Sequence, residues 1–201
     1  MNIMQTAISL GFNCEAAATA IDRGIRNRKE EGYLTCPFDT CLTNYNGIVE
    51  CIKDNFKYFC DSNFLTLVSP YKDCINNNGT GIYTKDTLVY NTKYKFIFNH
   101  ESPEHEDLYL KQGWLGGKMH FIDNNFQAFR ERYTRRINNF RKYIETSTKI
   151  TFILGNFNTD IHELNKELTY AYPKLNYTIL HYTPSCVRRF YDDVHSVMGY
   201  V

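Results

Sequence analysis

SLGFNCEAAA, residues 9–18, passes from an apolar run through Gly11 directly into an alanine-rich segment. This pattern predicts a buried strand over residues 3–10, a turn over 11–13, and a helix that begins at Asn13 and ends near Arg23. Cys14 then lies on the first turn of the helix, where unpaired N–H groups and the helix dipole favour the thiolate form. The alternative interpretation is a small apolar residue buried under the helix, since free cysteine is commonly buried.

Helical spacing also predicts which way Cys14 points. Ala17, Ala18 and Ile21 follow it three, four and seven residues later, so they share its helical face. We therefore expect the cysteine to face the body of the protein and not open water. Gly24 is a good residue to follow the end of this helix.

Hydrophobic periodicity predicts the remaining elements and an α+β fold. A second, amphipathic helix is expected after Asn44, a good N-cap residue. Residues 61–81 and 101–122 are expected to be loop-like or irregular. The other expected elements are two strands over 83–90 and 93–98 joined by a tight turn, a long helix over 125–145, a strand over 149–154, a short helix over 160–171, a strand over 177–182, and a terminal helix or tail from about 184.

Length and composition restrict the class of protein. A chain of 201 residues with 43% hydrophobic and 15% aromatic residues predicts one globular domain over residues 1–201. A net charge of +1 argues against a dedicated nucleic-acid binder. No apolar run is long enough to cross a membrane, and the first residues do not resemble a signal peptide.

Cysteine usage predicts a reducing compartment. The seven cysteines are scattered, and neither they nor the histidines have the spacing of metal ligands. We expect reduced thiols, no metal, no cofactor and a cytoplasmic protein. Abundant Asn, Lys, Ile, Tyr and Phe are typical of an AT-rich genome, such as that of a virus or an AT-rich microbe. The cytoplasm would be that of the host if the source is viral.

Two residues suggest nucleophilic catalysis. Cys14 begins a helix, and His100 follows an aromatic strand. A catalytic cysteine needs an imidazole to take its proton and a third polar group to orient the imidazole. Cysteine on a helix first and histidine on a strand later is the chain order of papain-like hydrolases. Sequence order alone does not show that the two side chains meet.

Four short blocks strengthen this interpretation: residues 9–14 (SLGFNC), 37–39 (PFD), 98–101 (FNHE) and 135–140 (RRINNF). In this order they resemble the signature of the putative papain-like cysteine peptidases, a domain of unknown function in bacteria and large DNA viruses. The resemblance covers most of the chain. It implies a papain-like fold with a helix bearing the nucleophile on a small, mostly antiparallel sheet, Cys14 as nucleophile and His100 as base. The family usually has a tryptophan after its Phe-Asp pair, where this chain has Thr40.

The sequence offers several candidates for the supporting residues. Asp39, in a matched block, is the preferred partner of the imidazole, and Asn156 is the alternative; each can also be an ordinary capping or turn residue. The Cys14 N–H, the Asn13 side chain and the Gly11 N–H are candidate donors for an oxyanion hole. Further candidates are a fallback base, otherwise a surface histidine, and two arginines of which one is expected to hold a buried carboxylate: His105, Arg135 and Arg136.

Three functions remain open. The first is a cysteine-dependent hydrolase that acts on an amide, isopeptide or ester, with a protein or peptide as substrate. The second is an acyltransferase that uses the same cysteine and histidine but passes the acyl group to an amine or alcohol. The third is a catalytically inactive scaffold that binds a protein, for example a viral factor that engages a host protein.

Overall fold

The structure is a computed structural model, and it describes residues 5–68, 87–103, 105–155 and 160–182 of the chain. Within these ranges the chain is a mixture of helices and two small sheets, which agrees with the predicted α+β class. The predicted start of the first strand, the first half of the strand over 83–90, Asn156 and the terminal segment lie outside the described residues. The second half of the strand over 83–90 is described and contributes to the strand Leu88–Asn91.

One sheet is parallel. Its strands are β1 (Gln5–Gly11), β5 (Lys149–Gly155) and β6 (Tyr177–Tyr182), in the order β1-β5-β6. Helix α5 (His162–Ala171) connects β5 to β6, as a parallel pair requires. Side chains of β5 are buried on both faces of the sheet, and its run ITFIL has the near-continuous apolar character of such a strand.

Helices cover both faces of this sheet. Helix α1 (Glu15–Asp22) packs on β1 and β5 through a small cluster in which Ala16 and Ala20 meet Ile153. Small alanine side chains allow this close approach. On the opposite face, Phe152 joins the main hydrophobic core and stacks against Phe140 of α4 (Asp123–Thr146). The site that follows β1 therefore lies on the α1 side of a two-faced sheet.

The second sheet is antiparallel, in the order β2-β3-β4: β2 (Leu65–Val68), β3 (Leu88–Asn91) and β4 (Phe96–Phe98). An isolated bridge between Leu42 and Ile97 connects its edge to the segment before helix α2 (Tyr45–Lys53). That helix begins as expected, because the Asn44 side chain accepts a hydrogen bond from the Gly47 N–H at 2.7 Å.

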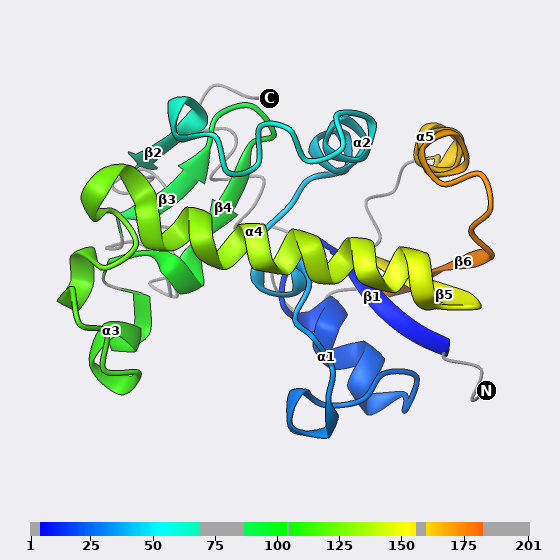
Figure 1. The fold of residues 1–201 in the computed structure, drawn as a ribbon, viewed down its shortest axis with the longest axis horizontal. Helices are drawn as coiled ribbons and strands as arrows, with labels where there is room; N and C mark the ends of the chain where they lie inside the picture. Colours follow the sequence, from blue (N-terminus) through cyan, green and yellow to red (C-terminus); the bar gives the residue numbers. More distant parts are fainter. Residues whose placement is uncertain (1–4, 69–86, 104, 156–159, 183–201) are drawn as a thin grey trace, which may run out of the picture.

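Helix α4 joins the two sheets, and Figure 1 shows it running along the molecule between them. Its buried side chains form one aromatic and aliphatic stripe, as its sequence predicts. Near one end, Phe129 and Tyr133 contact Phe98 of β4, with ring centroids 4.7 and 4.9 Å apart. Further along, Phe140 contacts β5. The short remaining elements are η1 (Lys29–Glu31), η2 (Pro37–Thr40), η3 (Ser62–Phe64), η4 (Asn99–Glu101), η5 (His105–Asp107), α3 (Leu108–Lys111) and η6 (Gly117–Met119).

Three expectations are corrected. The sheet under the nucleophile-bearing helix is parallel, not mostly antiparallel, because β1 pairs with β5, far along the chain, and not with a neighbouring hairpin. The segment 61–81, expected to be loop-like, contains strand β2. Cys14 is exposed and does not face the body of the protein. The buried face of α1 is formed by Ala16, Ala17 and Ala20, and two residues correspond to about 200° of helix, which places position 14 opposite Ala16.

In the part of the chain that the structure describes, no helix has both the length and the apolar character needed to cross a membrane.

Candidate active site

The turn that carries Cys14 has an unusual backbone. β1 ends at Gly11 with φ of 97°, and Phe12 follows with φ of 82°. Positive φ suits glycine, but it is uncommon for a bulky aromatic residue and costs about 1–3 kcal/mol. Phe12 is nevertheless buried, at 6% exposure. The strain therefore persists because the surroundings of the turn hold it in place.

Thr43 is the side chain that holds this turn. Its Oγ1 accepts a hydrogen bond from the Phe12 N–H at 3.0 Å and donates one to the Leu10 carbonyl at 3.3 Å. Its own N–H donates to the Phe12 carbonyl at 3.1 Å. Thr43 is fully buried, and a Cβ added at Gly11 would collide with it. These bonds fix both sides of the strained residue.

Gly155 completes the packing around the turn. It ends β5, and a Cβ there would lie 2.5 Å from the Phe12 Cβ. The absence of a side chain at Gly155 therefore lets the aromatic residue of the turn pass next to the end of β5.

Cys14 follows the turn and is exposed to solvent. Asn13 supports it from the side: its Oδ1 accepts hydrogen bonds from the Glu15 N–H at 3.0 Å and from the Tyr182 hydroxyl at 2.8 Å. Burial raises the pKa of Tyr182, and charges on Glu15 and Cys14 raise it further. Asn13 thus links the start of α1 to the end of β6, while the Gly11 N–H donates to Ser9 Oγ at 3.0 Å.

The other described cysteines have a different environment. Cys36, Cys41 and Cys51 are buried, and burial raises the pKa of each thiol well above its usual value. Cys60 is half-buried, and burial raises its pKa to about 11. Among the five cysteines in the described ranges, Cys14 is the only exposed one. Within the described ranges, Cys14 is therefore the thiol to which an external reagent or substrate has open access.

His100 lies in η4, directly after β4, and is half-buried. Burial lowers the pKa of its imidazole, Glu101 opposes this effect, and His105 and Arg136 lower the pKa further. The neutral ring favoured at neutral pH can accept a proton. Its ring lies 5.6 Å from that of His105, which is 2% exposed and therefore not the surface histidine expected from sequence.

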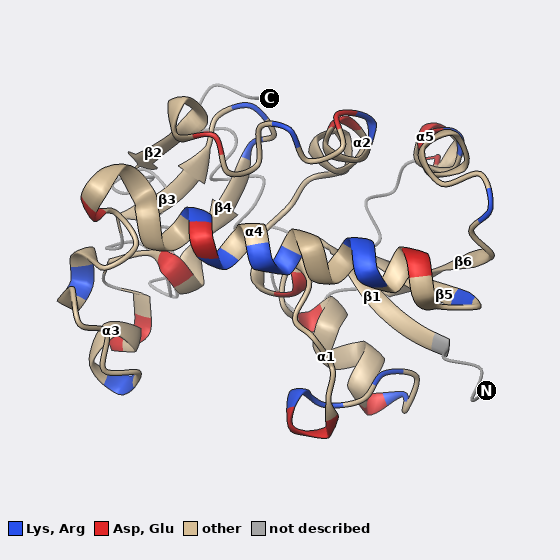
Figure 2. Ribbon diagram, viewed as in Figure 1, with Lys and Arg blue, Asp and Glu red and all other residues tan. Residues whose placement is uncertain are grey.

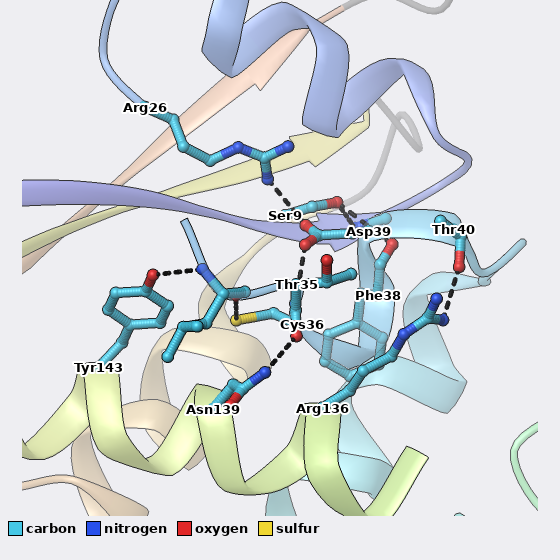
Figure 3. A network of polar contacts seen from close by, with 12 residues as sticks. Ser9, Arg26, Thr35, Cys36, Phe38, Asp39, Thr40, Arg136, Asn139 and Tyr143 are labelled. Carbon is cyan, nitrogen blue, oxygen red and sulfur yellow. Dashed lines mark hydrogen bonds and ion pairs between the residues drawn. The ribbon is translucent and has the colours of Figure 1, made fainter. Parts of the chain in front are cut away.

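Asp39 is buried, and both of its carboxylate oxygens bond to residues other than His100. Its Oδ1 pairs with Arg26 Nη1 at 2.8 Å, and its Oδ2 accepts the Cys36 N–H at 2.8 Å (Figure 3). Burial raises the pKa of this carboxyl, while Arg26 and the Cys36 N–H act in the opposite direction. Asp39 therefore caps η2 and connects this short helix to the segment after α1.

Side chains of α4 hold the same segment from the other side. Figure 3 shows three of them directed toward residues 34–40. Arg136 donates to Thr40 Oγ1 at 2.8 Å. Thr40 stands where the family usually has tryptophan, and in this chain it accepts a hydrogen bond from an arginine. The other two bonds join Asn139 Nδ2 to the Thr35 carbonyl at 2.9 Å and the Leu34 N–H to the Tyr143 hydroxyl at 2.8 Å.

Glu101, next to His100, is a fully buried carboxylate. Its Oε1 pairs with Arg132 at 2.9 Å and Arg136 at 3.4 Å, and its Oε2 accepts the Tyr133 hydroxyl at 2.9 Å. One of Arg135 and Arg136 was predicted to hold a buried carboxylate. In the structure this residue is Arg136, and the Arg135 side chain is exposed. Three donors from α4 compensate the charge that burial would otherwise disfavour.

The predicted site residues fall into two groups. Gly11, Asn13 and Cys14 lie together at the carboxyl end of the parallel sheet. His100 follows β4 and lines one pocket together with Arg136, while the carboxylate of Asp39 bonds to Arg26 and to the Cys36 N–H. Asn156 follows β5 but is outside the described residues.

Sequence reasoning missed Thr43, Gly155 and Glu101. Glu101 could have been found, because it lies in the block 98–101 that resembles the family signature. Thr43 and Gly155 could not, because their contacts with the turn depend on long-range pairing. No group of three or more His, Cys, Asp or Glu side chains in the described ranges is arranged to hold a metal ion.

A comparison with protein families assigns the chain. The sequence model of the family described as "Putative papain-like cysteine peptidase (DUF1796)" matches residues 5–185, and the chain belongs to this family. A search of curated proteins and a search of solved structures each found no match. The family match includes the strained turn, Cys14, His100 and the Glu101 cluster.

Proposed function

We propose that this protein is a cysteine-dependent hydrolase of the papain-like peptidase class, with Cys14 as the nucleophile. The observation that carries the proposal is an exposed thiol on a strained strand-to-helix turn, while the other described thiols are buried or half-buried. Strained backbone concentrates at functional sites, and nucleophiles of other hydrolases occupy comparable sharp turns between a strand and a helix. Membership of a family described as papain-like peptidases supports the same class and a papain-like fold.

The proposed reaction proceeds through an acyl-enzyme. The Cys14 sulfur attacks the carbonyl carbon of an amide, isopeptide or ester, and His100 takes the thiol proton. The imidazolium then gives this proton to the leaving amine or alcohol as the carbonyl–heteroatom bond breaks. Water, deprotonated by the same imidazole, attacks the thioester, and cleavage of the carbon–sulfur bond returns the proton to Cys14.

The start of α1 is suited to the negative charge that develops on the carbonyl oxygen. The positive end of the helix dipole lies beside Cys14, and an anion is favoured there. Hydrogen bonds to Oδ1 fix the Asn13 side chain, so its Nδ2 is the group that would donate to the oxyanion. Asp39 acts in this proposal as a positioning residue that fixes η2, because both its oxygens are bonded to Arg26 and Cys36.

The test separates the nucleophile from the base. Peptide, isopeptide and ester substrates with a fluorogenic leaving group are assayed with the unaltered protein and with Cys14→Ala, His100→Ala and Cys60→Ala. We expect Cys14→Ala to abolish turnover, His100→Ala to lower kcat by at least about a hundredfold, and Cys60→Ala to leave turnover unchanged. Turnover that survives in Cys14→Ala would contradict the proposal. Products that change on addition of an amine would identify an acyltransferase.

A binding module is the second candidate function. It is favoured by the engagement of both Asp39 oxygens with Arg26 and the Cys36 N–H, because the carboxylate expected to orient His100 is used elsewhere. In this case no substrate in the panel is turned over in a Cys14-dependent way, although Cys14 remains accessible to small reagents.

A further inference from the structure

A basic pocket lies beside the middle of α4, and Cys14 is not among the described residues that line it. Its volume is about 480 Å³, within the range of small-molecule sites. Four cationic side chains line it: Lys29, Arg132, Arg135 and Arg136. Among the described residues that line the pocket, none is acidic. Figure 2 shows Lys and Arg positions spaced along α4.

Two of the four cations of this pocket, Arg132 and Arg136, are held in place before any ligand arrives. The Nη1 of Arg132 and the Nη1 of Arg136 both contact Glu101, which is fully buried behind the pocket and does not line it. Arg136 is further fixed by Thr40, and both arginines remain partly exposed, at 23% and 12% of their side chains. Pre-positioned arginine forks lose little entropy on binding an anion.

The charge balance of the pocket is strongly positive. Among the described residues, one buried carboxylate, Glu101, contacts this set of four cations, although the whole chain has a net charge of only +1. A concave site with a local excess of positive charge suits a compact anion better than an extended polyanion such as nucleic acid. Arginine forks match the oxygens of phosphate in a bidentate geometry, and a phosphate dianion matches this excess better than a single carboxylate does.

We propose that this pocket binds a small ligand through a phosphate group. Arg135 and Arg136 supply the charged hydrogen bonds, and Thr40 and Asn139 line the wall beside them. His100 also lines the pocket, so the ligand lies against its imidazole. The inference goes beyond the proposed hydrolase, since it requires no reaction at Cys14.

The test is calorimetric titration of the full chain with inorganic phosphate, at neutral pH and constant ionic strength adjusted with chloride. Arg135→Gln removes an exposed cation of the pocket and leaves the Glu101 cluster intact. Arg130→Gln is the matched control, because it removes an exposed cation of the same helix that does not line the pocket. Succinate is titrated in parallel as a dicarboxylate probe.

We expect saturable binding at one site, weakened at least about tenfold in Arg135→Gln and unchanged in Arg130→Gln. Cys14→Ala should bind phosphate as the unaltered protein does, whether or not the protein proves to be a hydrolase. The inference is overturned if phosphate gives no saturable heat, if both arginine variants lose affinity equally, or if succinate binds more tightly than phosphate.

Discussion

Replacing Thr43 by valine tests whether its hydroxyl holds the strained turn before Cys14. Valine keeps the shape of the side chain but removes Oγ1, which leaves the buried Phe12 N–H without its 3.0 Å partner and removes the bond to Leu10. An unsatisfied buried donor costs about 1–3 kcal/mol. We therefore expect Thr43→Val to lower the free energy of unfolding by about 2 kcal/mol, measured by urea denaturation.

Thr43→Ser is the matched control, because it keeps the hydroxyl and removes only a buried methyl group. That deletion should cost about 1 kcal/mol. The two variants should also differ at Cys14. In Thr43→Val the turn relaxes, so the rate at which iodoacetamide modifies Cys14 should change, whereas Thr43→Ser should keep the native rate. Equal unfolding midpoints for Thr43→Val and the unaltered protein would refute the role assigned to the hydroxyl.

Three further predictions concern the surroundings of the candidate site. Gly155→Ala places a Cβ 2.5 Å from that of Phe12 and should destabilise the fold by about 1–3 kcal/mol in urea denaturation; an unchanged midpoint would refute this packing. Glu101→Gln leaves buried donors around an uncharged amide and should cost about 3 kcal/mol, whereas the exposed control Glu106→Gln should change stability by less than about 0.5 kcal/mol; similar losses in both would contradict the cluster. Folding lowers the pKa of His100, so the free energy of unfolding is at its full value above pH 6.5, the ordinary pKa of histidine, and falls as the pH drops below it. His100→Gln should flatten this acid-side decline in urea denaturation measured across pH. An identical pH profile in the two proteins would contradict the lowered pKa.

Local features of the fold were predictable from the sequence. The stripe of α4, the cap of α2 by Asn44 and the bounds of β6 depend on residues that are close along the chain. The exposure of Cys14 could also have been predicted. If Ala16 and Ala20, and not Ala18 and Ile21, are taken as the buried face of α1, helical spacing places Cys14 on the solvent side.

Long-range pairing was beyond sequence reasoning. The parallel register of β1 and β5 joins segments separated by most of the chain, and periodicity within one strand does not specify its neighbour. Thr43 meets Phe12 across 31 residues, and nothing in the local sequence marks it as the partner of a strained turn. Likewise, Asp39 was expected to orient His100, whereas the structure pairs it with Arg26, an arginine that had no predicted role.

The most direct test of the central claim is the rate of iodoacetamide alkylation at Cys14 as a function of pH, followed by mass spectrometry. Cys60, whose pKa is raised to about 11, serves as the reference thiol in the same sample. An activated nucleophile predicts that Cys14 reacts rapidly below the ordinary thiol pKa of about 8.5, far faster than Cys60, and that His100→Ala slows it. A Cys14 that reacts no faster than Cys60, with or without His100, would contradict the proposed hydrolase.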